Sequence, residues 1–242
     1  MDSGVFITGT DTDIGKTVIT TGLISALRAR GYDIGGMKPV QSGAIKQDGQ
    51  LLAPDIEFLL NYTDLADAYD LLNPIRLEPA LAPSVAAKLA EKEVDINQIM
   101  TAYQNLQTNY QGLIVEGAGG LMVPLTDDFL IPDLVKSLDL PVIVVARPDL
   151  GTINHTVLTV KAAQNLGLEV LGVIINGYQA AEAGVAEKTN PDLIAQLAEV
   201  PILGVVPYVE ELTDSNKSID LGAVLEEHVD LEVISDSVSV LS

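Results

Sequence analysis

The sequence predicts an α/β fold built on a single doubly wound, mostly parallel β-sheet with helices on both faces. Short apolar runs alternate with helical stretches along the 242 residues, a pattern typical of parallel sheets. The runs are continuously apolar rather than alternating, as expected for strands that are covered on both faces. The first run leads through a glycine-bounded loop into a helix, a layout typical of sheets that bind phosphate.

Six apolar runs are the expected strands, and seven segments are the expected helices. The strands are predicted at residues 5–9, 34–38, 112–116, 141–146, 169–176 and 202–206. The helices are predicted at residues 16–30, 56–60, 83–92, 96–109, 131–138, 153–166 and 192–199. Gly31 and Gly167 follow two of these helices and Pro132 lies in the first turn of another, which are favoured positions for these residue types.

No linker or repeat divides the chain, so we expect one domain over residues 1–242. The last ~15 residues are acidic and weakly patterned, and we expect them to be poorly ordered. The segment 61–83 carries no motif, and it fits either part of a substrate pocket or a surface excursion.

The composition limits the kinds of molecule that the protein is expected to bind. The net charge is −21, from 34 acidic and 13 basic residues, and so acidic a surface repels nucleic acid and anionic lipid. The chain has no cysteine, which excludes disulfides, thiolate catalysis and cysteine-based zinc sites. The N-terminus has no signal-peptide pattern, and no apolar run approaches the ~20 residues of a membrane helix. We therefore expect a cytoplasmic protein that binds neither nucleic acid nor membrane.

The loop after the first strand has the pattern of a phosphate-binding loop. Residues 9–17 have the sequence GTDTDIGKT, with Lys16 and Thr17 opening the helix. Loop amides and the positive end of the helix can cradle a phosphate chain, Lys16 can reach the β- and γ-phosphates, and the Thr17 hydroxyl can ligate Mg²⁺. Five residues separate the two glycines, where the usual pattern has four, so the alternative is an ordinary strand–turn–helix with a chance Gly-Lys-Thr.

Two further strands are expected to end on charged side chains, at the edge where parallel sheets bind their ligands. Lys38 ends the second strand, where a buried lysine is costly unless it faces an anion; the alternative is a lysine whose ammonium reaches the surface. Glu116 ends the third strand, and a carboxylate there suits Mg²⁺, directly or through water. The glycines at 117, 119 and 120 allow close approach of a ligand to the backbone, although they also fit a tight turn.

The fourth strand leads into a helix start at residues 149–155. Free amides there could bind a carboxylate, whereas Thr152 or Asn154 could equally be a simple N-cap. We interpret His155, in the same segment, as structural, because a lone histidine at a helix start rarely acts as a base.

Two more polar residues allow two interpretations each. Asn176 ends the fifth strand, and its amide can pair with the donor and acceptor groups of an adenine edge or form an Asn-Gly turn with Gly177. Asp55 precedes the helix expected at residues 56–60 and, taken alone, is interpreted as its N-cap.

Taken together, these residues resemble the dethiobiotin synthetase family. The resemblance rests on four motifs, at residues 9–17 (GTDTDIGKT), 38–43 (KPVQSG), 115–120 (VEGAGG) and 150–155 (LGTINH). They occur in the order of that family, and the five-residue spacer of the first motif is the one that the family shows. The motifs spread over more than half of the chain and are together highly specific, whereas the first alone indicates only a P-loop NTPase.

The resemblance implies an ATP-dependent ligase of biotin synthesis. The implied reaction is the ring closure of 7,8-diaminononanoate (7,8-diaminopelargonate) with CO₂, through a carbamate and a carbamic-phosphoric anhydride, to dethiobiotin, ADP and phosphate. The implied co-substrate is ATP, the implied cofactor is Mg²⁺, and the implied assembly is a homodimer with active sites at its interface.

The resemblance also implies roles for individual residues. Catalysis is implied for Lys38, Lys16 and Thr12. Magnesium ligation is implied for Thr17, Asp55 and Glu116. ATP contacts are implied for Asp13, Ile14, Gly15, Lys16, Thr17, Val18, Asp55, Glu116, Gly117, Ala118, Gly119, Asn176, Gly177, Pro207, Tyr208 and Val209. Diamine contacts are implied for Ser42, Gly151, Thr152, Ile153 and Asn154, the last four across the dimer interface.

Three alternatives compete with this interpretation. Another P-loop amide ligase, such as the cobyrinate-amidating enzymes, needs an ammonia source, and a chain without cysteine cannot hydrolyse glutamine with a thiolate. A partition or positioning ATPase commonly carries a second lysine early in the loop and needs a basic face or tail, whereas Asp11 and Asp13 make this loop acidic. A catalytically inactive binding module is disfavoured, because every residue expected for catalysis is present.

Overall fold

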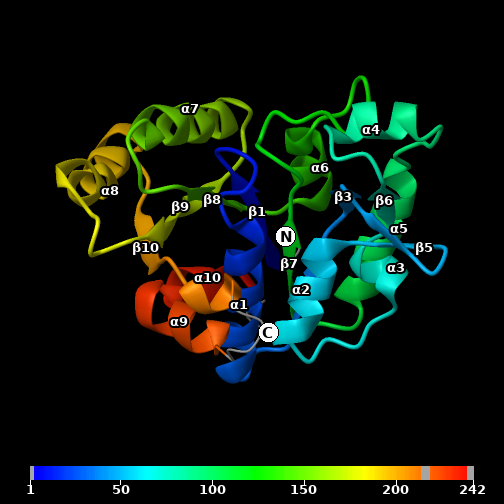
Figure 1. The fold of residues 1–242 in the computed structure, drawn as a ribbon, viewed down its shortest axis with the longest axis horizontal. Coiled ribbons are helices and arrows are strands. Elements are labelled where there is room, and N and C mark those ends of the chain that lie inside the picture. The colour runs from blue at the N-terminus through cyan, green and yellow to red at the C-terminus, as the bar shows by residue number, and fades with distance from the viewer. Residues whose placement is uncertain (1–2, 214–218, 239–242) are drawn as a thin grey trace.

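The computed structural model describes residues 3–213 and 219–238 (Figure 1). The centre of this described part is a sheet of six parallel strands in the order β10-β9-β8-β1-β7-β2. The strands are β1 (Gly4–Gly9), β2 (Ile34–Met37), β7 (Gly112–Glu116), β8 (Val142–Ala146), β9 (Val170–Tyr178) and β10 (Ile202–Pro207). The predicted doubly wound parallel sheet is thereby confirmed, with strand ends within two residues of those expected.

Helices cover both faces of the sheet. In the view of Figure 1, α7 lies above the sheet, whereas α1, α9 and α10 lie below it. No helix within residues 3–213 and 219–238 combines the length and the apolar character needed to cross a membrane. The seven expected helices are present as α1 (Lys16–Ala29), α2 (Pro54–Tyr62), α4 (Pro83–Leu89), α5 (Ile96–Gln107), α6 (Ile131–Leu138), α7 (Thr152–Asn165) and α8 (Val185–Ala198).

Helix α8 begins at Val185, well before the expected start at residue 192. The expected start followed Pro191, because a proline inside a helix removes a backbone hydrogen bond. Two side chains anchor the earlier start. The Glu187 carboxylate accepts a hydrogen bond from the Gly184 amide at 2.9 Å, and the buried Asn190 donates to the carbonyl of Pro148 at 2.7 Å.

Several short elements were not expected. The pieces of three or four residues are too short for a hydrophobic period to show in the sequence. Among them, β3 pairs in parallel with β6, and β4 forms an antiparallel hairpin with β5. The unexpected elements are β3 (Val40–Ser42), β4 (Ile45–Gln47), β5 (Gln50–Leu52), α3 (Tyr69–Leu72), β6 (Ile75–Leu77), η1 (Glu210–Thr213), α9 (Leu221–His228) and α10 (Leu231–Val238).

The expectation of a poorly ordered C-terminal stretch was wrong for its described part. Helix α10 buries Leu231, Ile234 and Val238, and it packs against β1 and α1. The spacing of these residues places them on one apolar face of the helix. Acidic residues lie between them in the sequence, so the overall composition of the segment does not show this face. Residues 239–242 of the expected stretch lie outside the described residues.

The order of the central strands determines where the polar strand ends lie. Strands β1, β7 and β2 are parallel neighbours, with Ile7 beside Glu116 and Met37 beside Val115. Their carboxyl ends therefore meet at one edge of the sheet. The glycine-rich loop, Lys38 and the loop after Glu116 leave the sheet at that edge.

Candidate active site

The phosphate-binding loop joins β1 to α1, and its backbone requires glycine at Gly15. This residue has φ 86°, a left-handed conformation that favours glycine. A Cβ atom on Gly15 would lie 2.0 Å from the side-chain nitrogen of Asn176, which donates to the carbonyl of Ile14 at 3.0 Å. No side chain caps the start of α1, so its first amides are free to bind an anion.

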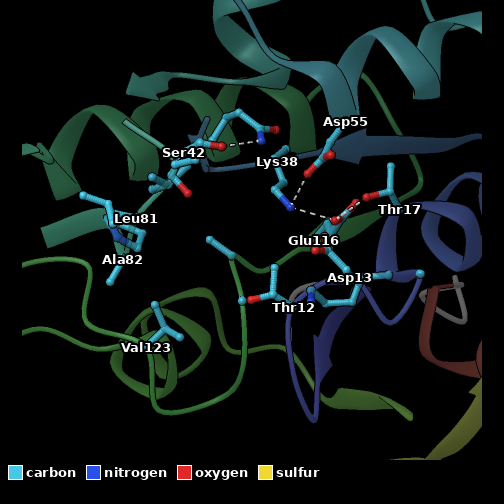
Figure 2. A pocket seen from close by; sticks show the side chains of 18 residues that line it. Thr12, Asp13, Thr17, Lys38, Ser42, Asp55, Leu81, Ala82, Glu116 and Val123 are labelled. Atoms are coloured by element: carbon cyan, nitrogen blue, oxygen red, sulfur yellow. Dashed lines mark hydrogen bonds and ion pairs between the residues drawn. The ribbon is translucent and has the colours of Figure 1, made fainter. Parts of the chain in front are cut away.

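A cavity of about 730 Å³ opens beside this loop (Figure 2). We call it the phosphate cavity; its walls come from the loop, Lys38 directly after β2, β3, the start of α2, the start of α4, and the end of β7 with the segment that follows it. The predicted site residues that line it are Thr12, Asp13, Gly15, Lys16, Thr17, Lys38, Ser42, Asp55, Glu116, Ala118 and Gly119. The lining residues that the sequence analysis missed are Val40, Gln41, Ala80, Leu81, Ala82, Pro83 and Val123.

Lys38 is the centre of the polar cluster in this cavity. Its ammonium lies 2.6 Å from Asp55 Oδ2 and 2.7 Å from Glu116 Oε1, and it donates to the Gly117 carbonyl at 3.0 Å. Figure 2 shows the ammonium between the two carboxylates. Lys38 is only 5% exposed, so the alternative of an ammonium that reaches the surface is wrong. A buried lysine is tolerated here because two carboxylates balance its charge.

Burial and charge perturb three groups of this cluster. Burial opposes the charge of Lys38, but Glu116 and Asp55 outweigh it and raise the pKa of Lys38. Burial raises the pKa of the Glu116 carboxyl, although the ammonium of Lys38 opposes that shift. Burial, followed by repulsion from Lys38, lowers the pKa of Lys16 to about 8. Lys16 donates to the Asp11 carbonyl at 2.8 Å, so it lies folded onto its own loop.

The oxygen donors of the cluster fit a hard divalent cation. The Thr17 hydroxyl donates to Glu116 Oε1 at 2.9 Å, and Asp55 faces the same glutamate across Lys38. One hydroxyl and two carboxylates are ligands that Mg²⁺ accepts when substrate phosphates complete its shell. No group of three or more His, Asp or Glu residues that could hold a metal ion occurs in the described part of the chain.

Asn73 is a further buried polar residue that the sequence analysis missed. It is fully buried, and its amide donates to the Lys38 carbonyl at 2.5 Å, while the Lys38 amide donates to the Leu72 carbonyl at 2.8 Å. Both backbone groups of Lys38 are therefore held by the segment 61–83, whose role the sequence left open. Only the Asn-Pro pair with Pro74 pointed to a turn there.

A second cavity, of about 400 Å³, is also lined by this loop, and we call it the base cavity. Residues predicted to contact ATP dominate its lining, and the loop residues Thr12, Asp13 and Gly15 line both cavities. The predicted residues in the base cavity are Asp13, Ile14, Gly15, Val18, Asn176, Gly177, Pro207, Tyr208 and Val209. The residues that the sequence analysis did not expect in it are Asp11, Arg147, Asp149 and Leu212.

Some predicted residues lie outside both cavities. Gly151–Asn154 begin α7 and line neither cavity, and Gly117 contributes only its carbonyl to Lys38. The N-cap of α7 is Gly151, without a side-chain cap, so the interpretation of Thr152 or Asn154 as the cap is wrong. The N-cap interpretation of Asp55 is also wrong, because α2 begins at Pro54 after the N-cap Ala53.

Comparison with known sequences gives one consistent result. A family described as AAA domain matches residues 3–216. The chain is 42% identical over 241 residues to the ATP-dependent dethiobiotin synthetase BioD of Thermodesulfovibrio yellowstonii, covering 97% of this chain and 99% of the relative. It is 44% identical over 218 residues to the protein of the same name from Methanococcus vannielii, covering 90% and 99%. The Bacillus subtilis protein of that name is 38% identical over 237 residues, covering 98% and 99%.

Comparison with solved structures shows the fold alone, since the sequence identities are low. The chain is similar to the MinD cell division protein of Aquifex aeolicus, with a TM-score of 0.54, 16% identity and coverage of 98% of this chain and 95% of that one. It is also similar to a ParA family ATPase from Chlorobium tepidum, with a TM-score of 0.55, 15% identity and coverage of 98% and 96%. Both confirm the P-loop NTPase-like fold.

Proposed function

The chain belongs to the dethiobiotin synthetase family, and on that premise we propose how its residues carry out the ATP-dependent formation of dethiobiotin. The enzyme is a ligase of biotin synthesis that closes 7,8-diaminononanoate and CO₂ into a cyclic urea, at the expense of ATP. The observation that carries the mechanism is the buried Lys38 ammonium between Asp55 and Glu116, in a cavity that it shares with the phosphate-binding loop.

ATP lies across the loop, with its phosphates in the phosphate cavity and its base in the base cavity. The free amides at the start of α1 and the Lys16 ammonium neutralise the β- and γ-phosphates. Two facts support this arrangement: Thr12, Asp13 and Gly15 line both cavities, and Lys16 is buried beside Lys38 at the phosphate end. The Asn176 amide and residues 207–209 hold the base.

The reaction has three bond-forming steps. One amine of the diamine adds to CO₂, loses a proton and becomes a carbamate. A carbamate oxygen attacks the γ-phosphorus, and the bond to ADP breaks. The second amine attacks the carbamate carbon, closes the ring and expels phosphate, which carries one oxygen from CO₂. This chemistry needs mainly positioning and charge neutralisation, because each attacking group is already nucleophilic.

Lys38 provides the cation at the point of attack. Its ammonium holds the carbamate oxygens and the charge that develops on the transferred phosphoryl group, with Lys16 on the phosphate side and the Thr12 hydroxyl beside it. The contacts that keep its ammonium buried and charged support this role, since both carboxylates raise its pKa. Ser42 faces the same cavity and contacts the diamine.

Magnesium would be held by Thr17, Asp55 and Glu116 together with phosphate oxygens. Two observations support this assignment: the Asp55 and Glu116 carboxylates already hold one cation, the Lys38 ammonium, and the Thr17 hydroxyl is bonded to Glu116. When bound, the metal supplies further positive charge to the β- and γ-phosphates. Before the substrate enters, the Thr17 hydroxyl orients the Glu116 carboxylate, and Asp55 orients the Lys38 ammonium. The two carboxylates balance the charge of that ammonium.

The carboxylate of the diamine binds at the start of α7 in a partner subunit, so the active enzyme is a homodimer. The uncapped first turn, residues 151–154, offers free amides to a carboxylate. Leu150, two residues before this helix, and Leu158, on the helix, are 83% and 62% exposed, as expected of a surface that a second subunit covers. The whole chain acts as one ligase domain in the cytoplasm, and its net charge of −21 disfavours nucleic acid and anionic membranes as partners.

The experiment that tests this function is product formation measured by mass spectrometry. Purified protein is incubated with diaminononanoate, bicarbonate, Mg²⁺ and ATP, and a parallel sample lacks the diamine. We expect dethiobiotin and ADP only when the diamine is present. ATP hydrolysis without the diamine, and no dethiobiotin with it, would contradict the proposal and favour a switch ATPase or a ligase for another substrate.

A further inference from the structure

Arg147 lies in the base cavity, and neither the motifs nor the mechanism above gives it a role. It directly follows β8, the neighbour of β1, and the two strands are joined beyond their pairing by the Thr10 amide donating to the Val145 carbonyl at 3.0 Å. Its side chain lines the base cavity together with Asn176 and Tyr208. The fold therefore brings a guanidinium to the pocket in which we propose that the base of ATP binds.

The Arg147 side chain has no partner within residues 3–213 and 219–238. The chain has four arginines, all among the described residues. Arg28, Arg30 and Arg76 each form an ion pair with a carboxylate, at 2.8 Å for Arg28 and 2.7 Å for Arg30. Arg147 forms neither an ion pair nor a hydrogen bond in this part of the chain, and its Nε atom is shielded from solvent without an acceptor. A shielded donor without an acceptor is destabilising, which indicates that a ligand supplies the acceptor.

The charges around Arg147 favour a nucleotide as that ligand. Asp11, Asp13 and Asp149 also line the base cavity, and none of them pairs with Arg147. An anionic nucleotide that enters this acidic pocket meets repulsion, which one free guanidinium offsets. A guanidinium also lies flat on aromatic rings and donates to ring nitrogens and hydroxyl oxygens, all of which a base and its ribose offer.

We propose that Arg147 is a nucleotide-binding residue that holds the base end of ATP through its guanidinium. This inference rests on the proposed function, because it assumes that the base occupies the base cavity. A contact at the base end is made equally by ATP and ADP, so Arg147 sets nucleotide affinity rather than the rate of phosphoryl transfer.

The test uses Arg147→Met in the full-length enzyme, with Arg30→Met as the matched control. Both substitutions remove one positive charge, but Arg30 pairs with Glu226 on α9 and lines neither cavity. Dissociation constants for Mg·ATP and Mg·ADP are measured by calorimetry without the diamine, alongside the KM for the diamine and the melting temperature of the free protein.

The expected results are specific to Arg147. Its replacement raises the dissociation constants of ATP and ADP by the same factor, about tenfold. Arg30→Met leaves both dissociation constants within about twofold of the wild-type values. The KM for the diamine stays near the wild-type value. Because Arg147 has no partner among the described residues of the free protein, its replacement is not expected to lower the melting temperature. Arg147→Lys, which keeps the charge but not the planar group, is the second variant if the methionine variant does not fold, and weaker ATP and ADP binding is again expected.

Three results would overturn the inference. The first is wild-type affinity for ATP and ADP in the Arg147 variants. The second is an equal loss in Arg30→Met, which would mean that only the net charge matters. The third is a rise in the diamine KM alone, which would assign the guanidinium to the substrate carboxylate, since its Nη2 atom lies 3.5 Å from the position of a Cβ on Gly151. Dethiobiotin formation by the wild-type enzyme is measured in parallel. If the wild type makes dethiobiotin, these three results count against the role of Arg147 and not against the proposed function.

Discussion

Replacing Lys38 by methionine removes the ammonium from the active-site cluster while keeping a side chain of similar length. Three contacts are lost, at 2.6 Å to Asp55, 2.7 Å to Glu116 and 3.0 Å to the Gly117 carbonyl. Because the same ammonium is proposed to hold the carbamate and the transferred phosphoryl group, we expect turnover to fall by ~10²–10³, the usual cost of losing one preorganised donor. Binding of Mg·ADP is expected to survive, because the loop amides and Lys16 are intact.

The same substitution has a second, independent consequence for stability. It leaves Glu116, which is 4% exposed, without its cation, and breaking a buried pair in this way costs about 3–5 kcal/mol. Burial already raises the pKa of Glu116, and loss of the opposing ammonium raises it further. A carboxyl with a raised pKa in the folded state binds its proton more tightly there than in the unfolded chain. The variant therefore loses stability as the pH rises above the ordinary glutamate pKa of 4.5, and its deficit relative to the wild type shrinks towards that pH.

The assay for both consequences compares Lys38→Met with the control Lys136→Met, an exposed lysine on α6 that lines neither cavity. Diamine-dependent ADP formation gives turnover, calorimetry gives nucleotide affinity, and melting at several pH values gives stability. Turnover of the Lys38 variant within a few-fold of the wild type would refute the catalytic role. A stability deficit that does not change with pH would refute the account of the Glu116 charge.

The remaining predictions concern the loop, the support of Lys38 and the partner's contribution. Gly15→Ala should weaken Mg·ATP by at least ~10²-fold in calorimetry, because φ is 86° and a Cβ would lie 2.0 Å from Asn176; near-normal affinity would contradict the loop geometry. Asn73→Ala should lower kcat about tenfold with ATP affinity unchanged, since it frees the Lys38 carbonyl; equal losses in both would indicate general disruption. Asn154→Ala should raise the diamine KM more than the ATP KM in steady-state kinetics, and equal effects would count against the carboxylate site.

The central sheet could be predicted from the sequence because its strands are buried on both faces. Continuous apolar runs such as residues 112–116 and 142–146 mark such strands directly. The short strands β3 to β6 leave no such pattern, since three residues show no period. Helix α10 was missed because its three buried apolar residues are interspersed with acidic ones, so composition alone suggested a tail.

The part of the candidate site that could be predicted from the sequence lies at the ends of strands and in the phosphate-binding loop. Lys38 and Glu116 stood out because a charge at the end of a buried strand needs a reason, and the sheet order brings them together. Asp55 stood out only through the family resemblance, since its local pattern favoured an N-cap. Asn73 binds the backbone of Lys38, and Arg147 shares its cavity with residues distant in sequence, so no local pattern pointed to either residue.

The most direct test of the mechanism follows the oxygen atoms of CO₂. The enzyme is mixed rapidly with the diamine, Mg·ATP and ¹⁸O-labelled CO₂ in ordinary water, and a single turnover is stopped before the label exchanges with solvent. If a carbamate oxygen attacks the γ-phosphorus, the released phosphate carries one ¹⁸O and the urea carbonyl of dethiobiotin carries the other. Dethiobiotin formed together with unlabelled phosphate would mean that water, not the carbamate, attacks ATP, and it would contradict the account.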